Sequence, residues 1–261
     1  MRRLNNCLKK KKYTSIPIWF MRQAGRYLKE FRNIRKKNPN FINLCLNQKL
    51  VNEISLQPIE KFDLDAVILF SDILIIPYGL GQKVIFKKNI GPILGDFSLE
   101  LILNVKENDF VNRINPVYKS LNLLKNNMDY KNKSLIGFAG APWTLLLYMI
   151  HKQSPKKNFD KNKILNDKNL SNNLITKLEN IICLHIDKQI EAGANIIQLF
   201  DSWAGLLSKD DLNKYCYSPT LKIVNHIKKK GIPIICFPRG IKKEDYKEFC
   251  STVKPNAISI D

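Results

Sequence analysis

Two arginines follow a short apolar run near the N-terminus of the chain. Residues 16–21 predict a short buried strand, and Arg22, Gln23 and Arg26 come directly after it. The guanidinium group is always charged, and its planar fork matches a carboxylate in bidentate fashion. Two such groups at the end of a strand predict a pocket for a substrate with several acid groups. In the alternative interpretation, the arginines are solvated on one turn of a surface helix.

Five further apolar runs alternate with longer helical patterns along the chain. The runs cover residues 66–70, 134–138, 195–200, 232–237 and 257–260. The helical patterns cover residues 50–62, 111–126, 143–152, 171–192, 212–230 and 243–251. Apolar strands that alternate with amphipathic helices indicate a parallel sheet. No G-x-G-x-x-G opens a helix after the first strand, so we predict a β/α barrel rather than a dinucleotide-binding fold.

Polar side chains follow the predicted strands at their carboxyl ends. They include Asp72, Tyr148 somewhat downstream of its strand, Ser202 and Arg239. Barrels place their chemistry where strands end and βα loops begin, so these groups should meet the arginines at one face. The set supplies cations, one central carboxylate, a phenol and a hydroxyl. It offers neither a metal triad nor a Ser-His-Asp arrangement, and we predict a site without metal or cofactor.

The formal net charge of +20 raises the question of a nucleic-acid or membrane partner. The lysines are spread along the chain among many Asn and Ile residues, as expected from a general drift in composition. No basic stripe with interleaved aromatic residues occurs, so we predict no nucleic-acid partner; a basic nucleic-acid binder is kept as an alternative. No run of about 20 uncharged apolar residues is present, which predicts no membrane span.

Cysteine usage and the start of the chain bear on location and domain organisation. The six cysteines are scattered without a C-x-x-C pair, as in a reduced cytoplasmic protein. Residues 1–15 form a basic extension that lacks the apolar core of a signal peptide. A short organellar presequence is the alternative for this segment. The remaining residues, 16–261, are predicted to form one barrel domain.

Four long blocks of sequence carry a family resemblance. They read PIWFMRQAGRY at residues 17–27, LQPIEKFDLDAVILFSDIL at 56–74, GFAGAPWTLLLYMI at 137–150 and QLFDSWAGLLS at 198–208. Together they resemble the uroporphyrinogen decarboxylase family. The resemblance implies a (β/α)8 TIM barrel and a homodimer. It also implies cofactor-free removal of carbon dioxide from the four acetate side chains of uroporphyrinogen III, giving coproporphyrinogen III in haem biosynthesis.

The resemblance also implies roles for single residues. Asp72 matches an aspartate that faces the pyrrole N–H groups, and Arg22 matches a suggested proton donor. The residues implied to bind substrate are Arg22, Gln23, Arg26, Asp72, Tyr148 and Ser202. The alternatives are structural. Asp72 and Ser202 could cap helices, and Tyr148 could be a core aromatic. Gln23 could hold in shape the loop that carries Arg22 and Arg26, called the arginine loop below.

The predicted strands number six, whereas the family barrel has eight. We therefore expect a barrel that is incomplete at its C-terminal side, and a chain that is unstable or inactive unless another polypeptide completes it. Two alternatives to an active decarboxylase stay open. One is a truncated, non-catalytic remnant or subunit fragment of that enzyme. The other is a superfamily methyltransferase, although the zinc-ligand spacing of such enzymes is not found in this sequence.

Overall fold

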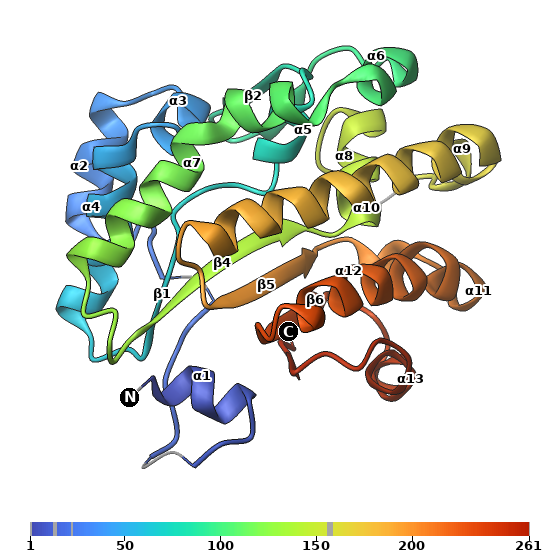
Figure 1. The fold of residues 1–261 in the computed structure, drawn as a ribbon. Coiled ribbons are helices and arrows are strands. Elements are labelled where there is room, and N and C mark those ends of the chain that lie inside the picture. Colours follow the sequence, from blue (N-terminus) through green and yellow to red (C-terminus); the bar gives the residue numbers. More distant parts are fainter. Residues whose placement is uncertain (1, 13–14, 22, 156–158, 261) are drawn as a thin grey trace.

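A five-stranded parallel sheet forms the centre of the protein (Figure 1). The structure is a computed structural model that describes residues 2–12, 15–21, 23–155 and 159–260. The strand order is β1 (Ala66–Ile68), β4 (Ser134–Gly140), β5 (Ile196–Asp201), β6 (Ile234–Pro238) and β7 (Ala257–Ile258). Each strand pairs with the next one of this series in the chain, without the reversal of order that marks a doubly wound sheet. Five of the six predicted strands are thus confirmed in the order of a barrel wall.

Six long helices match the six predicted helical patterns and cover the outer face of this sheet. They are α4 (Gln48–Lys61), α7 (Glu107–Asn127), α8 (Pro142–His151), α10 (Lys168–Glu191), α12 (Ser218–Lys229) and α13 (Lys243–Val253). Figure 1 shows α7 and α10 running along one side of the strands. Val67, Leu135 and Leu199 pack into the main core with these helices. Alternate strand residues belong to a second cluster, as the two-residue period of a strand requires.

Shorter elements connect these units. The additional helices are α1 (Arg3–Leu8), α2 (Lys29–Lys37), α3 (Phe41–Cys45), α5 (Ile75–Gly79), α6 (Leu99–Asn104), α9 (Asn162–Leu165) and α11 (Lys209–Leu212). A hairpin of β2 (Val84–Lys87) and β3 (Gly91–Leu94) and a short 3₁₀ helix (Ala204–Leu206) complete the set. Asn47 caps α4, and Asp167 caps α10, through side-chain oxygens that accept backbone N–H groups.

The predicted single helix over residues 212–230 was wrong at its start. A π-helical turn, Asn213–Tyr217, separates α11 from α12. Pro219 explains the break, because proline has no N–H to donate to a carbonyl in the preceding turn. The sequence therefore contained the cause of the break, although the apolar periodicity continued across it.

Helix α1 packs at the start of the barrel strands. Leu4 and Leu8 are both 8% exposed and belong to the cluster that contains Ala66, Ile136 and Ile196. Figure 1 shows α1 beneath the ends at which β4 and β5 begin. Its contacts reach far along the chain. The Asn5 side chain donates to the carbonyl of residue 195 (2.8 Å), and the side chain of residue 256 donates to the carbonyl of Leu8 (3.2 Å).

Replacement of Leu8 by alanine tests whether this helix contributes to stability. Leu8→Ala is expected to lower the free energy of unfolding by about 2 to 5 kcal/mol, because it removes a buried side chain and leaves a cavity. Urea denaturation measures the change. Lys12→Ala, which alters an exposed residue of the same basic segment, is the control and should leave stability unchanged. Equal stability of both variants would show that α1 is not docked in solution.

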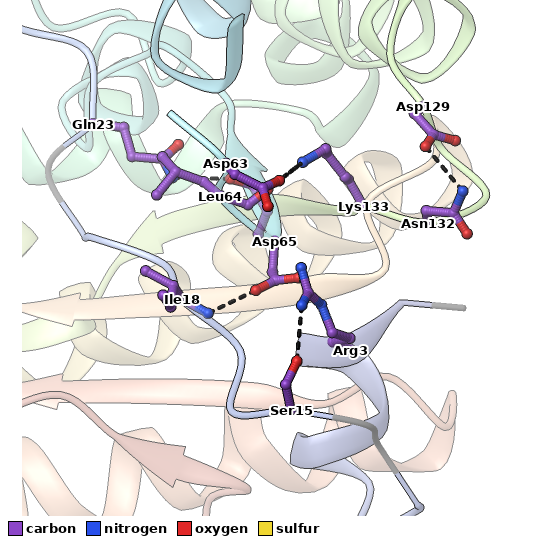
Figure 2. Close-up of polar contacts among 11 residues, drawn as sticks. Arg3, Ser15, Ile18, Gln23, Asp63, Leu64, Asp65, Asp129, Asn132 and Lys133 are labelled. Carbon is purple, nitrogen blue, oxygen red and sulfur yellow. Dashed lines mark hydrogen bonds and ion pairs between the residues drawn. The ribbon is translucent and has the colours of Figure 1, made fainter. Parts of the chain in front are cut away.

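Asp65 attaches the N-terminal segment to the start of β1 (Figure 2). One carboxylate oxygen accepts from Arg3 Nε (2.6 Å), and the other accepts from the backbone N–H of Ile18 (2.7 Å). The backbone N–H of Asp65 in turn donates to the carbonyl of Ile18 (2.9 Å). Arg3 also donates to the hydroxyl of Ser15 (2.8 Å). This network fixes the extended segment that contains Ile18 beside the start of β1.

The prediction of a buried strand at residues 16–21 was wrong. The segment is extended but is not assigned as a strand, and the side chains of Ile16, Ile18 and Phe20 are 82%, 52% and 63% exposed. Its backbone bonds run to Asp65 at the outer edge of β1. Within the described residues it has no strand partner on its other side. Apolar composition alone could not reveal that one side of the segment faces solvent.

Candidate active site

A cavity of about 550 Å³ opens at the carboxyl ends of the strands. Its lining comes from the segment before α2, from the β1 end and from the ends of β4, β5 and β6. The lining residues are Met21, Gln23, Ala24, Ile68, Leu69, Phe70, Ser71, Asp72, Ile73, Phe138, Phe200, Ser202, Phe237 and Arg239. The cavity therefore lies at the carboxyl ends of the strands, where the sequence predicted the site. Its polar lining groups come from four separate segments.

Asp72 is the carboxylate of this cavity. It lies four residues beyond β1, and the backbone N–H of Leu74 donates to its Oδ1 (2.8 Å). Burial raises the pKa of Asp72 from 3.8 to about 6, while the hydrogen bond from Leu74 acts in the opposite direction. The bond shows that Asp72 also shapes the turn before α5, but Asp72 does not cap that helix, whose N-cap residue is Leu74. At neutral pH the cavity still contains an ionised carboxylate in apolar surroundings.

Aromatic side chains line the cavity at the ends of three adjacent strands. Phe138, Phe200 and Phe237 come from β4, β5 and β6. The rings of Phe138 and Phe200 lie 5.5 Å apart edge to face, and those of Phe200 and Phe237 lie 6.4 Å apart. The candidate residues chosen from the sequence were the polar side chains after the strands, and these three aromatic rings were not among them. The missed signal was an aromatic residue near the end of each of three successive strands.

Gln23 lies in the lining and is 4% exposed. Its amide nitrogen donates to the carbonyl of Ala66 (2.9 Å), and its amide oxygen accepts from the N–H of Ile68 (3.3 Å). The side chain thus pairs with the outer edge of β1 much as a neighbouring strand would. The hydroxyl of Tyr27 donates to the Gln23 carbonyl. These contacts favour the view that Gln23 holds the arginine loop in shape.

Of the two arginines of the loop, the structure describes Arg26. Arg22 lies outside the described residues. Its neighbours Met21 and Gln23 both line the cavity. Arg26 is exposed, is not among the lining residues, and accepts a hydrogen bond from Arg32 at its backbone carbonyl (2.8 Å). The loop is therefore at the cavity, whereas the direct contact of either guanidinium with a substrate stays a prediction.

Ser202 lies in the loop after β5, and Tyr148 lies on helix α8. Ser202 lines the cavity directly. Tyr148 is 8% exposed and is not among the lining residues, and its hydroxyl lies 3.3 Å from the hydroxyl of Ser154. The Tyr148 ring packs edge to face on Trp203, the residue after Ser202, at 6.2 Å. Tyr148 is thus one side chain removed from the cavity in this structure.

A buried hydrogen-bond network supports the loop that carries Ser202. Asp201 is 4% exposed, and its Oδ1 accepts from the hydroxyl of Thr144 (2.6 Å). The same hydroxyl oxygen accepts the backbone N–H of Trp203 (3.1 Å). Burial raises the pKa of Asp201 to about 6, although the hydrogen bonds from Thr144 and Cys216 lower it. Thr144 and Asp201 therefore fix the residues on both sides of Ser202.

Thr144→Val is expected to weaken this network without changing the shape of the side chain. The valine leaves the buried Asp201 carboxylate without its hydroxyl donor, which should lower stability at pH 7 by about 1 to 3 kcal/mol. The folded pKa of Asp201 lies above the unfolded value of 3.8, so its charged form opposes folding as pH rises from about 4 to about 6. The valine raises that pKa further, so the deficit should grow with pH.

Urea denaturation between pH 4.5 and 8 measures this effect. Thr144→Ser, which keeps the hydroxyl, is the matched control and should retain most of the stability at every pH. A valine deficit that is the same at both ends of the pH range would contradict the assignment to Asp201.

Two general properties of the described residues complete the description of the site. No group of three or more His, Cys, Asp or Glu side chains with the geometry of a metal site occurs among them. In the same residues, no helix combines the length and the apolar character needed to cross a bilayer.

A solved structure supports the fold at low sequence identity. A methyltransferase from Methanosarcina mazei superposes with a TM-score of 0.78 at 17% identity, covering 98% of this chain and 74% of that chain. At this identity the likeness extends to the fold alone.

Family assignment comes from sequence comparison. The family model for uroporphyrinogen decarboxylase matches residues 1–261. A uroporphyrinogen decarboxylase of Rickettsia bellii (strain RML369-C) is 40% identical over 249 residues, which cover 94% of this chain and 72% of the relative. That of Campylobacter jejuni subsp. jejuni serotype O:2 is 42% identical over 245 residues, covering 91% and 71% respectively. With a matching model over its whole length, the chain belongs to the uroporphyrinogen decarboxylase family.

Proposed function

We propose that this protein decarboxylates the four acetate side chains of uroporphyrinogen III to methyl groups, releasing four molecules of carbon dioxide and giving coproporphyrinogen III. The proposal rests on family membership. The observation that carries it at the site is Asp72, a partly buried carboxylate in a strand-end cavity with apolar walls. A carboxylate suits a substrate that presents pyrrole N–H donors and develops positive charge as it reacts.

The chemistry explains why a buried anion is useful. Loss of carbon dioxide from a pyrrole acetate leaves an electron pair that needs an acceptor. Protonation of the pyrrole ring carbon creates that acceptor as a cation, and a nearby carboxylate stabilises the cation electrostatically. The electron pair then neutralises the ring as carbon dioxide leaves, and a second proton converts the exocyclic carbon to a methyl group. Loss of the first proton from the ring carbon restores the pyrrole, so each decarboxylation consumes one proton. Asp72 is the residue to which we assign the stabilising role.

The arginines are proposed to anchor substrate carboxylates. The resemblance offers Arg22 as the proton donor, but the pKa of a guanidinium is above about 12, which makes it a poor acid in water. We therefore assign Arg22 and Arg26 to electrostatic binding, with Gln23 shaping their loop and Ser202 contacting the substrate. Tyr148 is proposed to contact a substrate side chain after a local rearrangement around Trp203. The net charge of +20 would also attract an octacarboxylate to the protein.

Three finer features belong to the same proposal and follow from the family resemblance. The protein is proposed to act without metal or organic cofactor, as a homodimer, and in the cytoplasm. Sedimentation velocity on the purified protein tests the dimer. Turnover after exhaustive chelation of metals tests whether the protein acts without a metal.

The direct test of function is turnover of uroporphyrinogen III under anaerobic conditions. We expect four equivalents of carbon dioxide for each coproporphyrinogen formed, as measured by chromatography of the oxidised porphyrins. A protein that binds the substrate without releasing carbon dioxide would be the non-catalytic remnant instead. The methyltransferase alternative has no support beyond the shared fold, because the structural match is only 17% identical.

A further inference from the structure

Arg239 places a cation on the far side of the cavity from the arginine loop. It follows β6 and lines the same cavity as Asp72 and Gln23. Gln23 bonds to the free edge of β1, while β4 and β5 lie between β1 and β6 in the sheet. The cavity therefore has the arginine loop along one wall and Arg239 along the opposite wall. Asp72 belongs to the β1 side of this arrangement.

The backbone of Arg239 is fixed by the neighbouring loop. Its N–H donates to the carbonyl of Asp201 (3.1 Å), and its carbonyl accepts from the N–H of Gly205 (2.9 Å). Gly240 has a φ of +74°, which places the chain in the left-handed region directly after Arg239. A Cβ on Gly205 would lie 2.2 Å from the Gly240 carbonyl oxygen, so the two loops are in close contact. This attachment ties Arg239 to the loop that holds Ser202.

The surroundings suit carboxylate recognition. Phe200 and Phe237 lie in the same lining, and apolar surface beside an ion pair strengthens it by lowering the local dielectric constant. A guanidinium binds a carboxylate through two parallel N–H bonds. A macrocycle with acid groups around its rim needs cations on more than one side if it is to be held over a central anion. Cations on one wall alone would leave the acid groups on the opposite side of the macrocycle without a partner.

We propose that Arg239 binds a peripheral carboxylate of the substrate, on the wall opposite the arginine loop. This inference rests on the proposed function and adds a specific binding residue to it. Arg239 holds the macrocycle in register over Asp72, and the backbone contacts with Asp201 and Gly205 keep it in place. The competing role is a structural ion pair within the chain, which predicts lost stability rather than lost affinity.

The test compares Arg239→Gln with Lys242→Gln. Lys242 is exposed, lies three residues further along and is not in the lining, so its variant removes the same charge outside the cavity. Uroporphyrin, the oxidised octacarboxylate, serves as the probe, and quenching of its fluorescence gives Kd. Arg239→Gln is expected to raise Kd and KM by about 10- to 100-fold, because it removes a charged hydrogen-bond donor. We expect kcat to change less than about threefold, since binding rather than chemistry is affected.

Arg239→Lys and urea denaturation separate the outcomes. The lysine keeps the charge but loses the fork, so affinity should recover in part. A Kd for Arg239→Gln equal to that of Lys242→Gln overturns the proposal, as does a loss of affinity that follows a loss of folding stability. If the wild-type protein neither binds uroporphyrin nor converts uroporphyrinogen, the proposed function fails and the role of Arg239 fails with it. Wild-type turnover with an unaffected Arg239→Gln removes only the inference.

Discussion

Asp72→Asn is expected to fold normally and to lose roughly 100- to 1000-fold in kcat, the range typical for removal of one preorganised electrostatic group. Asparagine keeps an oxygen that can accept the N–H of Leu74, so the turn before α5 should persist. What disappears is the negative charge beneath the reacting pyrrole. Steady-state turnover of uroporphyrinogen and urea denaturation together measure both effects.

The pH dependence supplies a second measurement of the same residue. Burial raises the pKa of Asp72 to about 6, so the free enzyme loses its carboxylate charge below that pH. The value of kcat/KM should therefore fall as pH drops through about 6 in the wild type. The charged form opposes folding, so Asp72→Asn should be at least as stable as wild type at pH 7 to 8.

Asp210→Asn, which alters an exposed acid of α11, is the control and should keep wild-type turnover. Full activity of Asp72→Asn would reduce this residue to a turn-shaping role and would end the electrostatic mechanism. A large loss of stability in Asp72→Asn would show that the turn needs the charge itself.

Gly205→Ala should be the most disruptive single-atom addition near the site. Its Cβ would lie 2.2 Å from the carbonyl oxygen of Gly240 and 2.5 Å from its carbonyl carbon. Backbone atoms cannot rotate away as a flexible side chain would, so the loops after β5 and β6 must separate. We expect stability to fall by roughly 1 to 3 kcal/mol or more, as for other overpacked sites. The affinity for uroporphyrin should fall as well, because Arg239 moves with its loop.

Gly25→Ala is the matched control for stability. A Cβ there would make only ordinary contact with the ring of Tyr27, at 3.5 Å. Urea denaturation and fluorescence titration of both variants give the comparison. Equal stability of Gly205→Ala and wild type would mean that the two loops are not in contact in solution.

The carboxyl ends of the strands could be located from the sequence, because the alternation of elements is a local pattern. Short apolar runs marked β1, β4, β5 and β6 closely, and the polar residues after them included Asp72 and Ser202. The barrel rule then brought these residues to one face without any knowledge of contacts. The structure agrees for Asp72, Gln23 and Ser202, which share one cavity.

The remaining features depend on contacts between distant residues. The exposure of residues 16–21 depends on what lies beside the segment in space, which its composition does not record. The bond from Thr144 to Asp201 joins residues 57 positions apart. One hydroxyl and one carboxylate in two separate segments produce no periodic pattern from which the bond could be predicted. The β2–β3 hairpin was missed because its turn, with Asn89 at a φ of +63°, lies between two short and only partly buried runs.

The docking of α1 has a consequence for the order of folding. Its anchors at Asn195 and Asn256 are translated long after the helix itself. At a synthesis rate of about 5 to 20 residues per second, the first segment waits roughly 10 to 50 seconds for its last anchor. During that interval the apolar cluster against which Leu4 and Leu8 pack is incomplete. Helix α1 is therefore expected to dock last. Until Asn256 has emerged from the ribosome, proteases should cleave the nascent chain near residue 12.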